Sequence, residues 1–598
     1  MSASLHSTPT RELATGKPGR PLPRVPAWGL GLFILAVTAS TLWPFWWGLV
    51  PSRDRAFMLR DMMVPFNLSA NDLVLGKGDY SPRALPQDAI LAVFSPIIPA
   101  TTLAAAMVLT AAACGILGAV KMARDMAGAH RAAQLVCGLF VVWNPYVIER
   151  LLQGQWSLAL AVMLLPAIAY CAATGFRGPQ VLLISLAGLT PAGLVLGALV
   201  ALVFSPTARS RALVLFTSLT LATPWLLVTL FNGTPSRSSA NGAEAFAVGP
   251  DGPLGTVVSV LGLGGIWNAG AIPPSRGLLG ALAGLALFVF AAWGFAELWR
   301  VYRGVAVLTA AAFAVPLLLA TPFGLPLMRF LVAHVPGVAL FRDTHKLVGL
   351  ALPGLILLLA VGLERLRQRA ASTSTEFSPN GTRVLGGVVP LAVGALVIAT
   401  VPGYPADVSP AAPQRISPAW ASFAETIAGV PRSKILLFPP GNYRLREDGE
   451  PTLTPALKTL PGQPLDPQFL IVDGTLVDGD RDTIRLLKDA MAGRDTLAAN
   501  GVGWVIADRP LMTNNEEDYQ QLDELLAEYP MVDEAEGIQL YRIPQPHGAG
   551  SKQPSTPAVA GMVLYWITQL GALGAGLWSL GQARRDARRR ALAAEISS

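Results

Sequence analysis

Residues 156–174 read WSLALAVMLLPAIAYCAAT, a run that contains no charged side chain. As a helix, a run of this length spans the roughly 30 Å hydrocarbon core of a bilayer. Comparable runs recur along the chain, and 52% of the 598 residues are hydrophobic while only 14% are charged. A soluble domain typically has about 25% charged residues. The sequence therefore predicts an all-α polytopic membrane bundle.

Apolar length and flanking charge define the expected membrane spans. The spans are predicted at residues 28–49, 97–120, 132–146, 156–174, 211–231, 277–298, 304–322, 347–363, 384–402 and 558–580. A further apolar run at 177–209 is interrupted by Thr190 and Pro191. Because proline interrupts a helix and basic residues flank both ends, we expect two short segments that enter and leave on one side. The total is about 12 transmembrane or half-transmembrane helices.

The distribution of basic residues predicts the orientation of the bundle. Short cytoplasmic segments carry an excess of Lys and Arg. A basic cluster follows the last expected span and consists of Arg584, Arg585, Arg588, Arg589 and Arg590. We therefore expect a multi-pass plasma-membrane protein with a cytoplasmic N-terminal tail at 1–27, a bundle at 28–402, a final helix at 558–580 and a basic cytoplasmic tail at 581–598.

Residues 403–557 differ from the rest of the chain, because they hold 22 Asp and Glu against 13 Lys and Arg. Apolar residues that alternate with polar ones or form short continuous runs predict strands at 434–440, 502–508 and 537–543. Apolar residues at helical spacing predict helices at 482–493 and 516–529. We expect a C-terminal extracytoplasmic α/β domain. Residues 403–557 therefore carry a net charge of −9, and the rest of the chain carries +16, mostly next to the membrane, so the overall +7 does not indicate a nucleic-acid partner.

Two classes of membrane protein are disfavoured by what the spans contain. Proton relays and ion pathways need ionisable side chains at membrane depth, and the predicted spans hold almost none. The phosphate-binding pattern G-x-x-x-x-G-K-[ST] of ATP-driven proteins does not occur in the chain. A secondary transporter and an ATP-driven pump subunit are thus less favoured than a protein whose chemistry lies in its outer loops.

The expected outer loops concentrate acidic and basic residues on one side of the membrane. The first outer loop, 50–96, carries Asp54, Arg60 and Asp61 among alternating carboxylates and guanidinium groups. Later loops contribute WNPYVIERLLQGQW at 143–156, WNAGAIPPSR at 267–276 and FRDTHK at 341–346. This composition favours transfer of a sugar from a polyprenyl-phosphate donor, because a carboxylate can act as the base and cations can hold the phosphate.

The strings RDMMVP, SPRALPQDA, WNPYVIERLLQGQW and FRDTHK, together with the layout of spans, resemble the GT-C superfamily of membrane glycosyltransferases. They are similar to actinobacterial envelope proteins related to arabinofuranosyl- and mannosyltransferases and to YfhO-like proteins. The resemblance implies a polyprenyl-phosphate-linked sugar as donor, a cell-wall glycan, glycolipid or protein as acceptor, and a membrane lipid environment. The paired acidic motif common in that superfamily is absent, since Asp61 stands beside Arg60.

The resemblance assigns Asp61 as the general base, with Asp54 as the substitute. The remaining candidates are donor-phosphate ligands, namely Arg60, Arg342, His345 and Lys346, and residues of an acceptor groove, namely Glu149, Arg150, Gln153 and Gln155. No metal ligand set is assigned, although a divalent cation, Mg²⁺ or Mn²⁺, could assist the phosphate.

Each assignment has a structural alternative. Asp61 could form a loop salt bridge with Arg60, and the cations of FRDTHK could anchor a helix end at the lipid headgroups. Asp343 could bind a metal or pair with Arg342. At the level of the whole protein, the alternative is a non-enzymatic envelope-assembly protein that binds or transports a lipid-linked precursor. The transferase hypothesis requires the first outer loop and FRDTHK to meet at one pocket.

Overall fold

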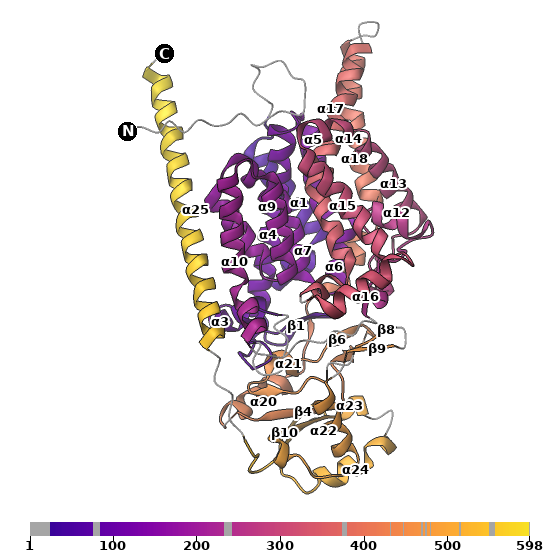
Figure 1. Cartoon of the computed structure of the whole chain (residues 1–598), viewed down its shortest axis with the longest axis vertical. Coiled ribbons are helices and arrows are strands. Elements are labelled where there is room, and N and C mark those ends of the chain that lie inside the picture. The colour runs from indigo at the N-terminus through magenta and orange to yellow at the C-terminus, as the bar shows by residue number, and fades with distance from the viewer. Residues whose placement is uncertain are drawn as a thin grey trace.

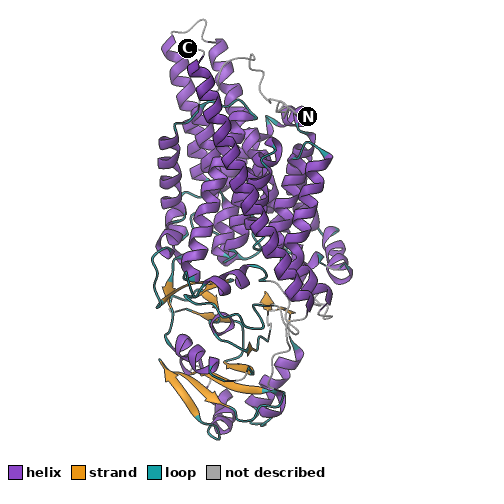
Figure 2. Ribbon diagram, turned by 90° about the vertical axis from the view of Figure 1, so that its left-hand side faces the viewer, coloured by secondary structure: helices purple, strands orange, loops and turns teal. Residues whose placement is uncertain are grey.

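The computed structural model describes residues 24–75, 84–231, 242–335, 337–373, 379–430, 432–446, 448–467, 470–472, 475–478, 480–512, 516–548 and 556–596. A helical bundle forms one end of the molecule and a smaller α/β unit the other (Figures 1 and 2). Residues 1–23 of the N-terminal tail, residues 76–83 of the first loop and the last two residues lie outside the described part.

The bundle is built from the helices up to residue 399 and from the last helix. These are α1 (Ala27–Thr41), α2 (Trp43–Gly48), α3 (Gln87–Phe94), α4 (Ala100–Asp125), α5 (Arg131–Val142), α6 (Pro145–Leu152), α7 (Trp156–Thr174), α8 (Arg177–Ala187), α9 (Pro191–Phe204), α10 (Ala208–Phe231), α11 (Gly242–Ala245), α12 (Gly255–Leu261), α13 (Leu278–Ala292), α14 (Phe295–Val301), α15 (Arg303–Leu319), α16 (Gly324–His334), α17 (Leu352–Thr373), α18 (Pro379–Ala399) and α25 (Thr556–Ile596).

The chain is a multi-pass membrane protein. In the described residues, seven helices are long and apolar enough to cross a bilayer, and up to nine if each of two bent pairs is one span. The bent pairs are α13 with α14 and α15 with α16, the second bent by 94°. The predicted run at 177–209 forms two helices, α8 and α9, with Pro191 at the start of α9. Both are too short to count as spans, so this count does not establish twelve crossings.

Helix α7 is the centre of the bundle. Every residue of α7 from Trp156 to Ala172 is buried, as expected for a helix that is apolar on all sides and surrounded by other helices. Close packing with α4 depends on a small residue, because a Cβ at Gly118 would lie 2.4 Å from the Cα of Ala167. By contrast, α25 packs against α8 and α10 and leaves apolar side chains such as Leu570 and Trp578 exposed, as a lipid-facing helix would.

One predicted span is longer than expected. The span expected at 132–146 extends further, because α6 continues it after a break. The candidate span therefore covers Arg131–Leu152, and the expected end at residue 146 is wrong. Asn144 caps α6 by accepting from the backbone N–H of Val147, and Pro145 occupies its first turn. Glu149 and Arg150, expected in an outer loop, therefore lie in a fully buried helix.

The α/β unit contains a five-stranded mixed sheet. Its order is β11 (Met531–Ala535), β12 (Ile538–Arg542), β10 (Val502–Asp508), β4 (Lys434–Phe438) and β7 (Gln463–Pro464). The pairs β10–β4 and β4–β7 are parallel, and the two pairs of β12 are antiparallel. The helices of the unit are α20 (Ala419–Ala428), α21 (Ala456–Thr459), α22 (Arg481–Met491), α23 (Arg509–Met512) and α24 (Glu516–Leu526), whereas the short helix α19 (Tyr404–Asp407) packs against the bundle. The three predicted strands correspond to β4, β10 and β12, and the two predicted helices to α22 and α24.

Smaller sheets connect this unit to the first loop. Strand β1 (Arg55–Leu59) pairs with β2 (Met62–Val64) on one side and with β3 (Gln414–Arg415) on the other, both antiparallel. The hairpin of β5 (Tyr443–Leu445) and β6 (Pro451–Leu453) lies next to them, and β8 (Leu470–Val472) pairs with β9 (Thr475–Asp478). The first loop and the chain after α18 therefore share one layer between the bundle and the five-stranded sheet (Figure 1).

Candidate functional site

Asp61 lies at the tip of the hairpin formed by β1 and β2. Leu59 pairs with Met62, so Arg60 and Asp61 are the two turn residues. Arg60 has a φ of 45°, in the left-handed region that two-residue hairpin turns use. The tight turn places Asp61, which is half-buried, where side chains from later segments reach it.

Three neutral side chains donate hydrogen bonds to the Asp61 carboxylate. The Nε2 atoms of Gln153 and Gln155 lie 3.3 and 3.2 Å from Oδ2, and the hydroxyl of Tyr443 donates to Oδ1. Asn268 in turn donates to Oε1 of Gln153 at 2.7 Å. The carboxylate is therefore oriented by amides and a phenol.

Gly154 lets the loop after α6 approach the hairpin. Its φ is 81°, and a Cβ there would lie 2.3 Å from the carbonyl oxygen of Leu59 and 2.7 Å from the amide nitrogen of Asp61. The backbone N–H of Asp61 donates to the carbonyl of Gln153 at 3.2 Å. Only glycine fits this close contact, which brings Gln153 and Gln155 to Asp61.

Arg60 holds the hairpin to its surroundings. Its guanidinium donates to the carbonyls of Leu152 and Gly270 at 2.7 and 2.6 Å and forms an ion pair with Glu450 at 2.8 Å. Burial lowers the pKa of Arg60, and the carboxylates of Glu450 and Asp61 oppose that effect. The predicted phosphate ligand Arg60 is thus bound to protein groups on several sides.

Arg150 connects the Asp61 site to FRDTHK. Its side chain has no exposed surface and donates to Asp343 at 2.5 and 3.0 Å. It also contacts Nδ1 of His345 at 2.9 Å and donates to Oε1 of Gln155 at 2.8 Å. The expected pairing of Asp343 with Arg342 is replaced by a pairing with Arg150. The first loop and FRDTHK therefore meet through a chain of side chains that runs from Asp61 through Gln155 and Arg150 to Asp343.

A second buried network lies beside the first. Arg276 forms an ion pair with Asp251 at 2.5 Å and lies 3.9 Å from Oε1 of Glu149. Glu149 also accepts from the backbone N–H of Ile266 at 3.2 Å and lies 3.7 Å from Nε2 of His345. Glu149, Arg150 and His345 are fully enclosed by these partners, so they support the site from behind and do not line an open groove.

Two carboxyls of these networks remain ionised because of their guanidinium partners. Burial alone would raise the pKa of Asp343, but Arg150 opposes burial and lowers the pKa to about 2. The same balance holds for Asp251, where Arg276 outweighs burial and lowers the pKa. Both carboxylates are therefore negative counterions of buried arginines.

The other two cations of FRDTHK are partly exposed. Lys346 donates from Nζ to the carbonyl of Leu340 at 2.8 Å and lies within electrostatic range of Asp61. The guanidinium of Arg342 lies 4.4 Å above the ring of Phe246, which itself packs edge-on against Trp267 at 4.5 Å. Both residues add positive charge to the FRDTHK segment, and the charge of Lys346 acts on Asp61.

Asp54 lies apart from this cluster. It is exposed, precedes β1, and accepts a hydrogen bond from Ser52, which is the main cause of its lowered pKa. The whole of β1 separates it from the turn that carries Asp61.

The donor set at Asp61 does not fit a bound divalent cation. Mg²⁺ and Mn²⁺ prefer several oxygen ligands that include carboxylates, whereas the side chains on Asp61 are two amide N–H groups and a phenol O–H. Across the described residues, no group of three or more His, Cys, Asp and Glu side chains is arranged to hold a metal.

Four residues of the site were not assigned a role from the sequence: Asn268, Arg276, Asp251 and Tyr443. Asn268 and Arg276 belong to the WNAGAIPPSR loop, whose place on the expected outer side was the available signal. Nothing in the sequence around Asp251 or Tyr443 indicated a partner, because Tyr443 is 382 positions from Asp61.

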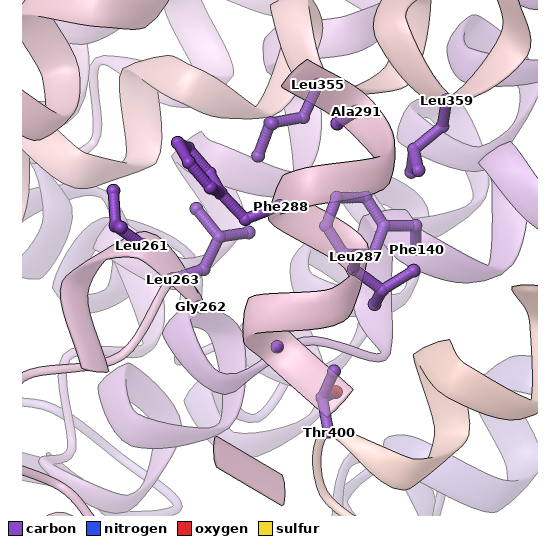
Figure 3. Close-up of a pocket in the computed structure, with 11 residues that line it drawn as sticks. Phe140, Leu261, Gly262, Leu263, Leu287, Phe288, Ala291, Leu355, Leu359 and Thr400 are labelled. Carbon is purple, nitrogen blue, oxygen red and sulfur yellow. The ribbon is translucent and has the colours of Figure 1, made fainter. Parts of the chain in front are cut away.

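An apolar pocket opens in the bundle beside the second network (Figure 3). It is lined mainly by aliphatic and aromatic side chains, among them Phe140, Leu287, Phe288 and Leu355. Gly262 lines its edge, where a Cβ would lie 3.1 Å from Nη2 of Arg276. The lining of the pocket is thus predominantly apolar.

Comparison with known proteins shows a fold and no family. No family model matches the chain, and no curated protein matches it. A cryo-EM structure of the arabinofuranosyltransferase AftD from mycobacteria is similar, with a TM-score of 0.51 at 15% identity over 89% of this chain. The likeness is one of fold. The chain spans only 40% of the length of that AftD chain. A mutant form of AftD matches over 87% of this chain and 42% of the AftD chain, with a TM-score of 0.46 at 15% identity.

Proposed function

We propose that this chain is a membrane glycosyltransferase of the cell envelope, which transfers a sugar from a polyprenyl-phosphate donor to a glycan, glycolipid or protein acceptor on the outer face. The observation that carries the proposal is the half-buried Asp61 carboxylate, which is held by three neutral donors and lies within electrostatic range of Lys346 of FRDTHK. The GT-C-like fold supports the same reaction class. Both termini are assigned to the cytoplasm.

Asp61 acts as the general base in this proposal. An acceptor hydroxyl oxygen attacks the anomeric carbon of the donor sugar, and its proton passes to Asp61. The bond between the anomeric carbon and the phosphate oxygen breaks, and its electron pair leaves with the polyprenyl phosphate. A carboxylate paired with a guanidinium would be a weaker base, and the side-chain donors on Asp61 are two amides and a phenol.

Lys346 and Arg342 bind the donor phosphate. Lys346 has three N–H donors, of which one reaches the carbonyl of Leu340. Arg342 stacks on Phe246 and is half-buried. Because Arg60 and His345 are enclosed by protein partners, we assign them to positioning the hairpin and Arg150. Gln153 and Gln155 orient Asp61, and the polyprenyl chain lies against the apolar bundle.

The direct test is turnover of a labelled polyprenyl-phospho-sugar by the purified protein, with polyprenyl phosphate release and product formation as readouts. Asp61→Asn should lower the rate by roughly 10² to 10⁴, the usual contribution of a general base. Asp482→Asn is the matched control, because Asp482 is 86% exposed on α22 and pairs with the exposed Arg485. An Asp61→Asn protein that turns over like Asp482→Asn would contradict the assignment.

Asp54 is the competing base, and a paired comparison separates the two. Loss of turnover in Asp61→Asn and retention in Asp54→Asn would support Asp61. The reverse pattern would move the base to the exposed loop before β1. In cells, Asp61→Asn at normal protein level should change envelope glycans in the same way as loss of the gene.

The second candidate is a non-enzymatic protein that binds a lipid-linked precursor. It is favoured by the single carboxylate at the site, both oxygens of which already accept hydrogen bonds. Saturable binding of the labelled donor without turnover, together with normal envelope glycans in the Asp61→Asn strain, would select this function over the transferase.

A further inference from the structure

The β5–β6 hairpin of the α/β unit is docked directly onto the turn that carries Asp61. The backbone N–H of Arg60 donates to the carbonyl of Pro451 at 2.7 Å, and the N–H of Leu453 donates to the carbonyl of Arg60 at 3.1 Å. Glu450 pairs with the Arg60 guanidinium. This geometry fixes the hairpin against both backbone and side chain of the turn, so its position is defined relative to Asp61.

Tyr443 is the residue of this hairpin that enters the site. Its hydroxyl donates to Oδ1 of Asp61, and its side chain remains 37% exposed. An ionised carboxylate has about four acceptor positions, two on each oxygen. Gln153 and Gln155 take the two positions on Oδ2, and Tyr443 takes one on Oδ1. Among the side chains that the structure describes, one acceptor position therefore remains, and it lies on the oxygen that the phenol shares.

We infer that Tyr443 is a positioning residue for the transfer reaction, which directs the remaining acceptor position of Asp61 toward the incoming hydroxyl. The inference rests on the proposed function. The inference makes the α/β unit part of the reaction site, because the two glutamines belong to the bundle and Tyr443, the third donor, belongs to the part of the chain that follows α18. Tyr443 acts through Asp61 and takes no proton itself.

The test is a set of steady-state measurements on the full-length protein with a labelled polyprenyl-phospho-sugar and an acceptor. Tyr443→Phe removes only the hydroxyl, and it should lower kcat by roughly tenfold or more, the worth of one hydrogen bond to a charged group. KM for the donor should stay within about twofold of the wild-type value, because the proposed phosphate ligands are Lys346 and Arg342. A structural defect would instead lower the amount of folded protein and leave kcat per folded molecule unchanged.

A double-mutant cycle shows whether Tyr443 works through Asp61. In the Asp61→Asn background, Tyr443→Phe should have no further effect on kcat, since the group that it positions has already lost its basicity. Tyr170→Phe is the matched control, because Tyr170 also donates to a carboxylate, that of Asp125 at 2.9 Å, at the other end of α7. Equal losses in Tyr443→Phe and Tyr170→Phe, or independent effects of Tyr443→Phe and Asp61→Asn, would overturn the inference.

Failure of the inference and failure of the proposed function give different results. A wild-type protein without turnover contradicts the transferase function. An active wild type, an inactive Asp61→Asn variant and a fully active Tyr443→Phe variant contradict only the role of Tyr443.

Discussion

Asp61 and Asp343 are linked by one chain of side chains, yet their surroundings differ in kind. Asp343 is buried and bound by the guanidinium of Arg150, which makes it a fixed counterion. Asp61 is half-buried and bound by two amides and a phenol. Neutral donors orient a carboxylate without neutralising it. In the proposed function, this difference distinguishes Asp61, which takes up the proton, from Asp343, which keeps Arg150 in place.

The largest effect is expected from a substitution that breaks the Arg150–Asp343 pair. Arg150→Ala leaves an unpaired carboxylate in the interior and should cost about 3 to 5 kcal/mol of unfolding free energy. Thermal unfolding of the purified protein in detergent measures the loss. Replacing both partners, Arg150→Met with Asp343→Leu, should recover most of it, because no buried charge remains. If the double variant were as unstable as Arg150→Ala, the pair would not be the cause.

A smaller effect is expected at the contact that brings the glutamines to Asp61. Gly154→Ala combines a left-handed φ, which costs roughly 1 to 2 kcal/mol, with a steric overlap worth about 1 to 3 kcal/mol. Gly175→Ala is the matched control, since Gly175 has a φ of 77° but nothing within 4 Å of an added Cβ. Gly154→Ala should lower the turnover rate more than Gly175→Ala does. Equal turnover and equal stability in the two variants would show that the close approach is unimportant.

The smallest effect concerns acid stability. Because Arg150 lowers the pKa of Asp343 to about 2 from its ordinary value of 3.8, the pair contributes stability above roughly pH 4 that is lost as the pH falls through about 2. The expected difference is roughly 2 kcal/mol. The unfolding free energies of wild type and Asp343→Asn, measured at a series of pH values, should therefore converge as the pH falls from 4 to 2. A constant gap across that range would assign the stability to another group.

Much of the fold follows from local patterns in the sequence. The uncharged runs of α4 and α7 and the continuous apolar segments of β4 and β10 are each decided by a few neighbouring residues. The break before Pro191 is likewise local, because proline at the start of a helix interrupts the preceding one. Such elements need no knowledge of their partners.

The arrangement of the site depends on partners that are distant in the sequence. Arg150 and Asp343 are 193 positions apart, and Asp251 meets Arg276 only because the loops around α12 fold back onto α6. From the sequence, Asp343 was expected to pair with its neighbour Arg342. Glu149 and Arg150 were expected in an outer loop. Their burial could not be predicted, because an isolated charged pair near a span end is indistinguishable from an interfacial one until its counterions are known.

The pairing of β1 with β3 has a consequence for biogenesis. Arg55 and Ala56 are translated early, but their partners Arg415 and Gln414 emerge about 360 residues later. At roughly 5 to 20 residues per second, the first loop waits on the order of 20 to 70 s for the strand that completes its sheet. During that interval β1 has an open edge, and the reaction site cannot exist until nearly the whole bundle has been inserted.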